Sequence, residues 1–185
     1  MSEKIQGQPE VELRSIGSTE DFETLADWFA LPHVIHGWGG QTGNLAEFKA
    51  REHDTHAMIV ADGVPVGYLC GSLLMEIDAV EAGLEGLFAN LVDIDIFIGA
   101  PECLGRGIGP QAIELLIKRL AKNPNQQWAG LGTSQANHSA IGAFEKAGFR
   151  EYRAYENPIY GPCVYMVRAL RDDEKSIVDF PFRNC

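Results

Sequence analysis

A glycine-rich loop between a strand and a helix constrains the fold of this chain more than any other feature. Residues 91–99 (LVDIDIFIG) alternate strongly and predict a strand. Gly105, Gly107 and Gly109 follow at alternate positions, and residues 111–122 then predict an amphipathic helix. The apolar face of that helix comprises Ile113, Leu116, Ile117 and Leu120. A strand that turns into a helix within a few residues predicts a sheet with helices packed on it.

The same loop is a candidate anion site. Glycines allow tight turns and close approach of the backbone to a ligand. Pro110 fits the first turn of the helix, where its missing N–H costs nothing. Unpaired N–H groups and the positive end of the helix dipole favour a pyrophosphate there. A glycine loop that only connects two elements is the alternative, and the dinucleotide fingerprint and the nucleoside-triphosphatase motif do not match.

The rest of the pattern completes a mixed sheet with helices. Ser18 or Thr19 caps a helix that runs through Phe29, residues 31–40 predict a loop, and Asp62-Gly63 is a hairpin signal. Residues 78–85 form an acidic connection, and Gly148 ends the last helix. Strands are expected at 11–16, 55–61, 65–75, 91–99, 128–132, 149–155 and 164–170, and further helices at 45–52, 111–122 and 139–147. We expect a single domain over 1–185, with a flexible lead at 1–9 and an unplaced tail at 172–185.

Composition excludes several classes of function. The net charge of −11 argues against nucleic acid and favours cationic small molecules, although acidity can also serve only solubility. No apolar run is long enough to cross a bilayer, and the polar start of the chain does not resemble a secretion signal, so no membrane and a cytoplasmic location are expected. The four cysteines form no CxxC pair, and His53 and His56 lack a third ligand, so we expect no metal.

A second motif makes a resemblance specific. The segment NHSAIGAFEKAGF (137–149) follows the loop by about thirty residues. Together the two motifs resemble the acetyl-coenzyme-A-binding halves of the GCN5-related N-acetyltransferase (GNAT) superfamily, over roughly residues 55–170. The resemblance implies an α+β (α/β) fold with a mixed, mostly antiparallel central sheet flanked by helices. It also implies that acetyl-CoA is the co-substrate.

The resemblance further implies which residues hold the cofactor. The loop would bind the pyrophosphate through backbone N–H groups, and residues 97–98 would pair with the pantetheine arm as an added strand does. Asn137 would hydrogen-bond that arm, and Ala140 and Phe144 would pack along it. Plain helix core is the alternative role for Ala140, Ile141 and Phe144, and both roles can hold together. The implied cofactor-binding residues are Phe97, Ile98, Leu104, Gly105, Arg106, Gly107, Ile108, Gly109, Asn137, Ala140 and Phe144.

Two positions depart from the superfamily pattern. Leu104 stands where Arg or Gln is usual, a minor change if backbone donors bind the phosphates. Phe144 stands where many members have a Tyr that protonates the departing thiolate, and phenylalanine has no proton to give. Water or another group must then supply the proton, or the thiolate leaves unassisted, and Tyr160 and Tyr165 are candidate substitutes.

The acceptor side is predicted from the strand before the loop. Asp93 and Asp95 share one face of that strand, because residues two apart in a strand point the same way. Carboxylates in an apolar strand are costly unless they are paired, used or open to solvent. An ammonium must lose a proton before it attacks a thioester, and a carboxylate can bind it and take that proton. We assign Asp95 as catalytic base or amine anchor and Asp93 as a second substrate-binding residue.

Within the superfamily, the chain is most similar to the aminoglycoside 6′-N-acetyltransferases. The similarity rests on HVIHGWGG (33–40), Asp95, the glycine loop, the 137–149 motif and GPCVYMV (161–167). It implies that Trp38 lines the acceptor site. An acidic residue that some members have just before the Asn motif is absent at 131–133, and the acidic stretch 76–86 is a candidate replacement. His33 and His36 are expected to pack or hydrogen-bond in their loop rather than to catalyse.

The leading hypothesis is therefore acetyl transfer from acetyl-CoA to a primary amine of a cationic small molecule, with an aminoglycoside first. A siderophore-type amine or hydroxylamine and a protein N-terminus are alternative acceptors. A non-catalytic acyl-CoA-binding sensor is an alternative of another class, which Phe144 favours and the two strand aspartates disfavour. A homodimer is expected only because symmetric dimers are common.

Overall fold

The computed structural model describes residues 7–38, 56–81, 84, 90–157 and 160–171. Its strands are hydrogen-bonded in this order: β1 (Val11–Ser15), β2 (Ala57–Ala61), β3 (Val64–Leu73), β4 (Leu91–Ile98), β5 (Trp128–Ser134), β7 (Gly161–Ala169) and β6 (Arg150–Asn157). β4 and β5 are parallel, whereas β1–β2, β2–β3, β5–β7 and β6–β7 are antiparallel. The expected mixed, mostly antiparallel sheet with helices is confirmed. The chain divides into two compact units, residues 1–71 with 95–115 and residues 72–94 with 116–185, and the expectation of a single domain stays a prediction.

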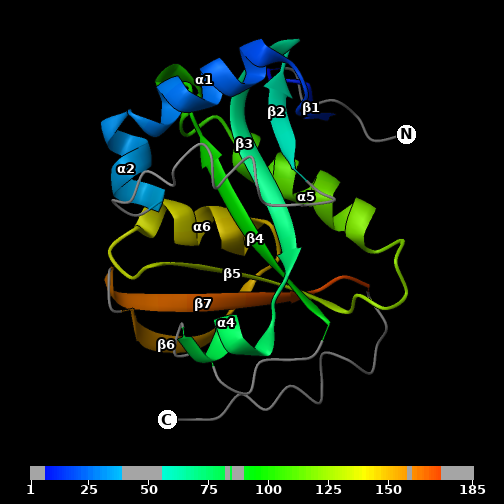
Figure 1. Cartoon of the computed structure of the whole chain (residues 1–185), viewed down its shortest axis with the longest axis vertical. Coiled ribbons are helices and arrows are strands. Elements are labelled where there is room, and N and C mark those ends of the chain that lie inside the picture. Colours follow the sequence, from blue (N-terminus) through cyan, green and yellow to red (C-terminus); the bar gives the residue numbers. More distant parts are fainter. Residues whose placement is uncertain (1–6, 39–55, 82–83, 85–89, 158–159, 172–185) are drawn as a thin grey trace. The chain divides into compact units, whose positions relative to one another are not determined.

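The first unit begins with three antiparallel strands. β1 (Val11–Ser15), β2 (Ala57–Ala61) and β3 (Val64–Leu73) lie side by side, with β2 in the middle (Figure 1). Asp62 and Gly63 connect β2 to β3 and both have positive φ, 50° and 81°. Two central residues with positive φ suit the right-handed twist of the strands they join, so the predicted hairpin is confirmed.

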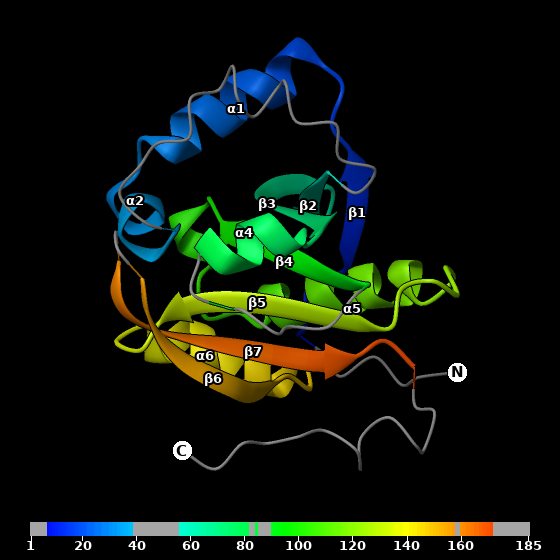
Figure 2. The same cartoon turned by 60° about the horizontal axis from the view of Figure 1, so that its bottom comes forward.

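Helix α1 (Thr19–Phe29) covers one face of these strands (Figure 2). Ser18 is its N-cap, and a capping box with Asp21 fixes the first turn, as the cap signal in the sequence predicts. The apolar face of α1 contributes three core residues, all at most 9% exposed: Leu25, Trp28 and Phe29. They pack with residues of β2 and β3, so burial of this face holds the helix on the strands.

The prediction of a loop at 31–40 is wrong for its first part. Residues Pro32–Trp38 form the short helix α2, with proline at the first position, where a missing N–H is tolerated. Val34 is 3% exposed and belongs to the same core cluster as α1. Burial of this one side chain gives a reason for order in a glycine- and aromatic-rich segment that has little intrinsic helix preference.

The segment that carries the cofactor motif follows β4 (Leu91–Ile98). A one-turn 3₁₀ helix, η1 (Pro101–Cys103), precedes the glycine loop, and α5 runs from Ile108 to Leu120. The helix therefore begins three residues before the predicted start, with Pro110 inside its first turn. All four residues of the predicted apolar face are at most 3% exposed: Ile113, Leu116, Ile117 and Leu120.

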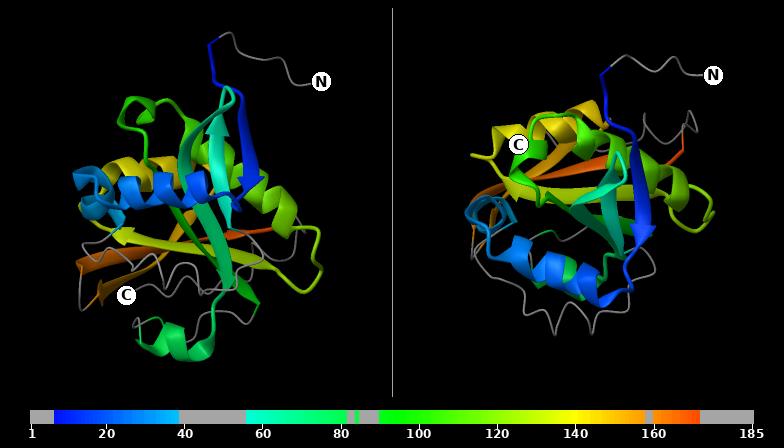
Figure 3. Two further views of the ribbon diagram at one scale, coloured as in Figure 1. Left: turned by 45° about the horizontal axis from the view of Figure 1, so that its top comes forward. Right: turned by 90° about the horizontal axis from the view of Figure 1, so that it is seen from above.

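The second unit contains the last three strands. β7 (Gly161–Ala169) lies between β5 (Trp128–Ser134) and β6 (Arg150–Asn157), as Figure 3 shows. Helix α6 spans His138–Lys146, and Gly148 after it has φ of 80°, so the predicted glycine stop is confirmed. The observed bounds of β5, α6, β6 and β7 all lie within about three residues of the predicted ones.

The acidic connection predicted at 78–85 is wrong for its first part. Residues Glu76–Glu81 form the short helix α4, whose Ala79 is 5% exposed in the core cluster of the second unit. The backbone N–H of Ala79 donates to the carbonyl of Met75 over 3.0 Å. As with α2, a side chain buried in a core cluster accompanies order in a segment whose composition predicts a solvated connection.

Some predictions lie outside the described residues. They are the helix at 45–52, most of the lead at 1–9 and the tail at 172–185. Within the described ranges, none of the helices combines the length and the hydropathy that a membrane span requires.

Candidate acetyl-transfer site

Glycine is favoured in this loop by positive backbone φ angles and not by crowding around the missing side chains. Gly105 and Gly107 have φ of 71° and 76°, a region that L-residues with a side chain rarely adopt. A Cβ atom built on Gly105, Gly107 or Gly109 would meet no protein atom within 4 Å. The space against the loop is therefore open, and the loop can present its backbone to a ligand.

The N–H groups of this loop form a row of donors. From Gly105 to Gly109 they donate to no acceptor among the described residues. The last two belong to the first turn of α5, whose dipole places partial positive charge at the same point. The side-chain amide of Gln111 donates to the carbonyl of Gly107 over 3.2 Å and supports the turn. Such a row suits the oxygens of a pyrophosphate.

The end of β4 is held in place by its neighbours in the first unit. Nε2 of His33 hydrogen-bonds the carbonyl of Ile98 over 3.0 Å, so the prediction of a packing or hydrogen-bonding role for His33 is confirmed. The N–H groups of Gly99 and Ala100 both donate to the carbonyl of Val66, over 2.8 and 3.0 Å. These bonds fix the point at which the strand turns into the loop.

Phe97 contributes its side chain to the core of the first unit. It is 8% exposed, and its ring lies 5.5 Å from that of Tyr68 and 6.3 Å from that of Trp28, between centroids. Only the backbone of Phe97 and Ile98 is then suited to the predicted pairing with a pantetheine arm. The parallel ladder between β4 and β5 pairs residues 91–93 with 128–130, so residues 97–98 lie beyond it.

Asn137 is the N-cap of α6 and Phe144 lies within that helix, both in the second unit. Oδ1 of Asn137 caps α6 by accepting from the N–H of Ala140 over 3.1 Å, and this cap does not use the amide nitrogen. Phe144 is 7% exposed and packs near Phe149, at 6.5 Å between ring centroids. Helix core is therefore one role of Phe144, and Ala140 is half-buried beside it on the helix.

The two strand aspartates lie in different surroundings. Asp93 is half-buried, and its Oδ1 accepts a hydrogen bond of 2.6 Å from the hydroxyl of Tyr165. Asp95 is also half-buried, and it belongs to the first unit. Tyr165, which the sequence offers as a proton donor for the thiolate, is 2% exposed and directs its proton to Asp93. Tyr160, the other candidate, is 40% exposed.

Two tyrosine hydroxyls lie over glycines of β5. A Cβ atom on Gly130 would collide with the hydroxyl of Tyr165, and one on Gly132 would lie 2.8 Å from the hydroxyl of Tyr155. Glycine is required at both positions because the rings fill the volume of the missing side chains. In the parallel ladder Asp93 is opposite Gly130, so the carboxylate and both hydroxyls belong to one cluster of the second unit.

Burial controls the protonation of this cluster. Removal from water raises the pKa of the Tyr155 phenol well above its usual range, and neighbouring Cys163 and Asp93 raise it further. Burial also raises the pKa of the Cys163 thiol, and a hydrogen bond with Tyr155 opposes that rise. Both groups are therefore neutral near pH 7, and Asp93 is the acidic group of the cluster.

Sequence reasoning missed Tyr155, Cys163 and the two glycines as members of the cluster around Asp93. The available signal was the alternation of glycine at 130 and 132 in a strand, which predicts that something packs closely against it. Trp38 is the last residue of α2, and its side chain lies outside the described part of the structure. The acidic stretch 76–86 is partly α4 and partly outside it.

Clusters of metal ligands are absent from the described part of the chain, which excludes His53. The prediction that the protein binds no metal stays a prediction. The cysteines that the structure describes are buried and form no disulfide with one another: Cys70, Cys103 and Cys163.

Residues 18–156 match the family model of the acetyltransferase (GNAT) domain. The chain belongs to the GNAT acetyltransferase family. This match spans both motifs, from before α1 to the end of β6, so the glycine loop and Asn137 belong to the fold that the model describes.

Two relatives of this acetyltransferase are named for acetyl transfer to aminoglycosides. It is 26% identical over 175 residues to the aminoglycoside N(6′)-acetyltransferase type 1 of Klebsiella pneumoniae, covering 84% of this chain and 82% of that one. Among solved structures, AAC(6′)-Ib with ribostamycin and coenzyme A superimposes with a TM-score of 0.74 at 26% identity, over 92% and 99% of the two chains. AAC(6′)-Ib with coenzyme A and kanamycin gives 0.72 at 25%, over 86% and 95%.

Proposed function

We propose that this protein transfers the acetyl group of acetyl-CoA to a primary amine of a cationic small molecule, with an aminoglycoside amine as the first candidate. The row of N–H donors at the start of α5, which have no acceptor among the described residues, carries this proposal in a chain of the GNAT family. The net charge of −11 supports a cationic acceptor, because a negative field raises the local concentration of cations.

Acetyl-CoA is the donor in this proposal. Its pyrophosphate would lie against the N–H groups of Gly105–Gly109, which donate to no acceptor among the described residues. The backbone of residues 97–98 would pair with the pantetheine arm, and the amide nitrogen of Asn137 would donate to it. Backbone donors near residues 96–98 would stabilise the oxyanion. Solved relatives hold coenzyme A, and one holds acetyl-CoA.

Asp95 would prepare the acceptor. Its carboxylate binds the substrate ammonium and takes one proton, directly or through a water molecule. The free amine attacks the thioester carbonyl in a ternary complex, the C–N bond forms, and the C–S bond of the tetrahedral intermediate breaks. The nitrogen then loses its second proton and the thiolate gains one, so an ammonium and a thioester yield an amide, a thiol and one proton.

Because Phe144 has no proton to donate, another group must protonate the departing thiolate. A buried phenyl ring supplies no proton, and Tyr165 directs its proton to Asp93. Water is then the proton source that best fits an open glycine loop. Phe144 is also the one observation that favours the second candidate function, a sensor that binds acyl-CoA without transferring the acyl group.

One assay separates these functions and the possible acceptors. Acetyl-CoA is supplied and thiol release is followed with aminoglycosides including kanamycin, polyamines, hydroxylysine and short peptides. We expect release with aminoglycosides and little with peptides. Tight coenzyme A binding without thiol release from any amine would contradict the enzyme and support the sensor. Release with hydroxylysine or peptides alone would identify the siderophore-type or N-terminal acceptor instead. A cytoplasmic location and a homodimer belong to the same proposal, and gel filtration tests the latter.

A further inference from the structure

Helix α2 is attached to the end of β4 through one side chain. His33 lies in the first turn of α2, and its Nε2 is 3.0 Å from the carbonyl oxygen of Ile98. A carbonyl only accepts hydrogen bonds, so Nε2 carries a proton and donates it. The two residues are 65 positions apart in the chain, and both belong to the first unit. This hydrogen bond therefore links two segments that are far apart in the sequence.

The carbonyl that His33 binds faces the side of β4 opposite β3. The N–H of Gly99 donates to the carbonyl of Val66 in β3 over 2.8 Å. Within one trans peptide group the carbonyl and the N–H point in opposite directions, so the carbonyl of Ile98 points away from β3. The N–H of a strand residue points to the same side as its carbonyl. Because β3 occupies one side of β4, a pantetheine arm paired with Ile98 would lie on this other side, next to α2.

Other contacts also hold the end of β4 in place. Gly99 lies so close to the ring of Trp28 in α1 that a Cβ atom on Gly99 would collide with it. The N–H groups of Gly99 and Ala100 both donate to the carbonyl of Val66. Packing from α1 and hydrogen bonds from β3 therefore fix the strand end independently of His33.

Helix α2 has fewer attachments. It has seven residues, and a helix of this length is not stable by itself in water. Val34 is 3% exposed in the core cluster of the first unit, and His33 is half-buried. The other residues of α2 whose burial the structure describes are exposed: Pro32, Ile35, His36 and Gly37. Loss of the hydrogen bond from His33 would therefore release α2 more than it would release β4.

We infer that His33 is a positioning residue that holds α2 beside the end of β4 and thereby sets how tightly the acceptor amine binds. This inference rests on the proposed function and on the prediction that Trp38, the last residue of α2, lines the acceptor site. His33 takes no part in breaking or forming bonds. Its contribution is expected in the KM of the acceptor rather than in kcat, because α2 would contact the acceptor equally in the ground and transition states.

Two amide substitutions form a matched pair for the test. Glutamine carries its amide nitrogen as many bonds from Cα as Nε2 of histidine, so His33→Gln keeps a donor within reach of Ile98. Asparagine carries the same group one bond closer to Cα, so His33→Asn keeps the polarity and loses the reach. A structural role without effect on the acceptor would change the unfolding midpoint in urea and leave the KM of the acceptor unchanged in both variants.

Kinetics with kanamycin as the acceptor gives the first measurement. For His33→Asn we expect KM for kanamycin to rise about 3-fold to 10-fold, the range that corresponds to one hydrogen bond. The kcat and the Kd for coenzyme A should stay at their wild-type values, because β3 and α1 still hold the end of β4. For His33→Gln we expect all three constants to return to wild type.

Hydrogen exchange tests the attachment of α2 without any acceptor. The N–H groups of Val34 and Ile35 both donate to the carbonyl of Leu31 over 3.0 Å. In His33→Asn the exchange of these two amides should accelerate about 3-fold to 10-fold, whereas the amide of Leu25 in α1 should exchange at the wild-type rate. His33→Gln should accelerate neither. A general loss of stability would accelerate exchange in both helices.

The outcomes that overturn the inference are distinct from those that overturn the proposed function. Unchanged exchange in α2, equal acceleration in α1 and α2, equal KM values in the two variants, or an effect on kcat alone would each overturn the inference. If the wild-type protein acetylates no amine, the proposed function fails. Calorimetric binding of kanamycin then takes the place of KM, and no binding or equal affinities of wild type and His33→Asn would overturn the inference.

Discussion

The phenolic hydroxyl of Tyr165 occupies the space that a side chain at Gly130 would need. Tyr165 is 2% exposed, so its ring has no free direction in which to move. Gly130 is therefore fixed by packing rather than by its backbone angles, since it is not among the glycines with positive φ. Glycine is therefore needed for different physical reasons in two places. Packing requires it in β5, whereas positive φ favours it in the glycine loop.

Gly130→Ala should destabilise the fold. The added methyl group would collide with Tyr165 and disturb its hydrogen bond to Asp93, and overpacking of this kind costs about 1–3 kcal/mol. The free energy of unfolding in urea measures the loss. Gly142→Ala is the matched control: it lies in α6, a Cβ there meets nothing within 4 Å, and helix propensity predicts a gain of about 0.5–1 kcal/mol. An unchanged stability for Gly130→Ala would contradict the packing argument.

Gly107→Ala should weaken coenzyme A binding beyond its effect on stability. With φ of 76°, alanine at this position costs about 1 kcal/mol and shifts the loop that carries the N–H donors. Gly63→Ala is the control, because Gly63 has φ of 81° and the same open space but lies in the β2–β3 hairpin. Calorimetry should give a Kd for coenzyme A that rises in the first variant only. Equal Kd values in both variants would remove the loop from the cofactor site.

Asp95→Asn should abolish most of the activity. If Asp95 takes the proton from the ammonium, kcat/KM falls by about 100-fold or more, because the amide cannot accept that proton. The Kd for coenzyme A should stay at the wild-type value, since Asp95 has no proposed contact with the cofactor. Initial rates of thiol release with kanamycin, measured beside that Kd, check both statements. A wild-type rate would exclude Asp95 from the mechanism.

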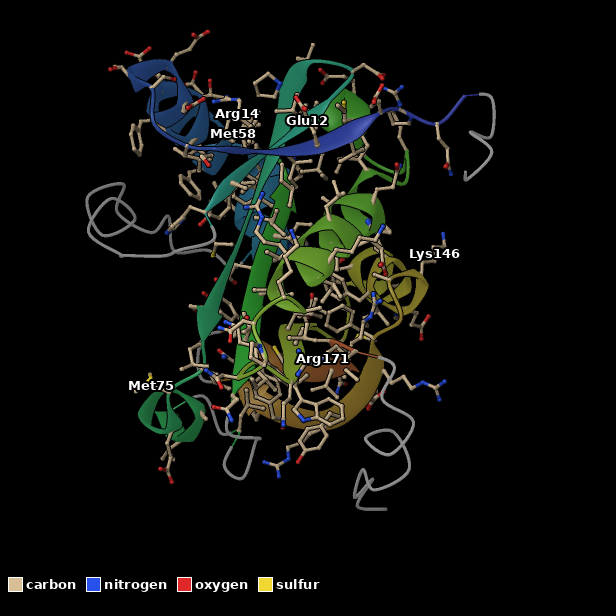
Figure 4. All side chains as sticks on the ribbon, turned by 90° about the vertical axis from the view of Figure 1, so that its right-hand side faces the viewer. Glu12, Arg14, Met58, Met75, Lys146 and Arg171 are labelled. Carbon is tan, nitrogen blue, oxygen red and sulfur yellow. The ribbon has the colours of Figure 1, made fainter. Side chains whose placement is uncertain are left out.

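Asp21→Asn should destabilise the fold at neutral pH and not in acid. Asp21 is 3% exposed and accepts from both terminal nitrogens of the Arg14 guanidinium, over 3.0 and 2.5 Å, as well as from the N–H groups of Gly17 and Ser18. Arg14, which belongs to β1, is labelled in Figure 4. Arg14 holds the pKa of this carboxyl well below its usual range, and the backbone N–H bonds lower it further while burial opposes them.

The sign of the pH effect follows from that lowered pKa. The unfolded carboxyl titrates near its ordinary value of about 4, so its stabilisation is fully present above that pH and is lost as pH falls toward the folded pKa. We expect Asp21→Asn to cost about 1–3 kcal/mol at pH 7, and the difference from wild type to shrink steadily below about pH 4. Urea unfolding across this range measures it. Glu20→Gln, exposed in the same helical turn, is the control, and a pH-independent difference would contradict the assignment.

Local signals predicted most elements correctly because their causes lie within a few residues. The hairpin at Asp62–Gly63 needs only two residues with positive φ, and the cap at Ser18 needs only a partner three positions along the chain. The short helices α2 and α4 were missed for the opposite reason. Their intrinsic preference is weak, and the burial of Val34 and Ala79 in tertiary core clusters accompanies their order.

The residues of the candidate site also fall into those that local sequence predicts and those that only the tertiary structure brings together. The sequence alone determined the glycine loop, the Asn137 motif and the aspartates of β4, because these patterns are contiguous and their chemistry follows from residue type and spacing. Only the tertiary structure brought Tyr165, which is 72 residues away, to Asp93 and placed it over Gly130. Strand pairing sets such contacts through register between segments far apart in the chain, and no local periodicity encodes that register.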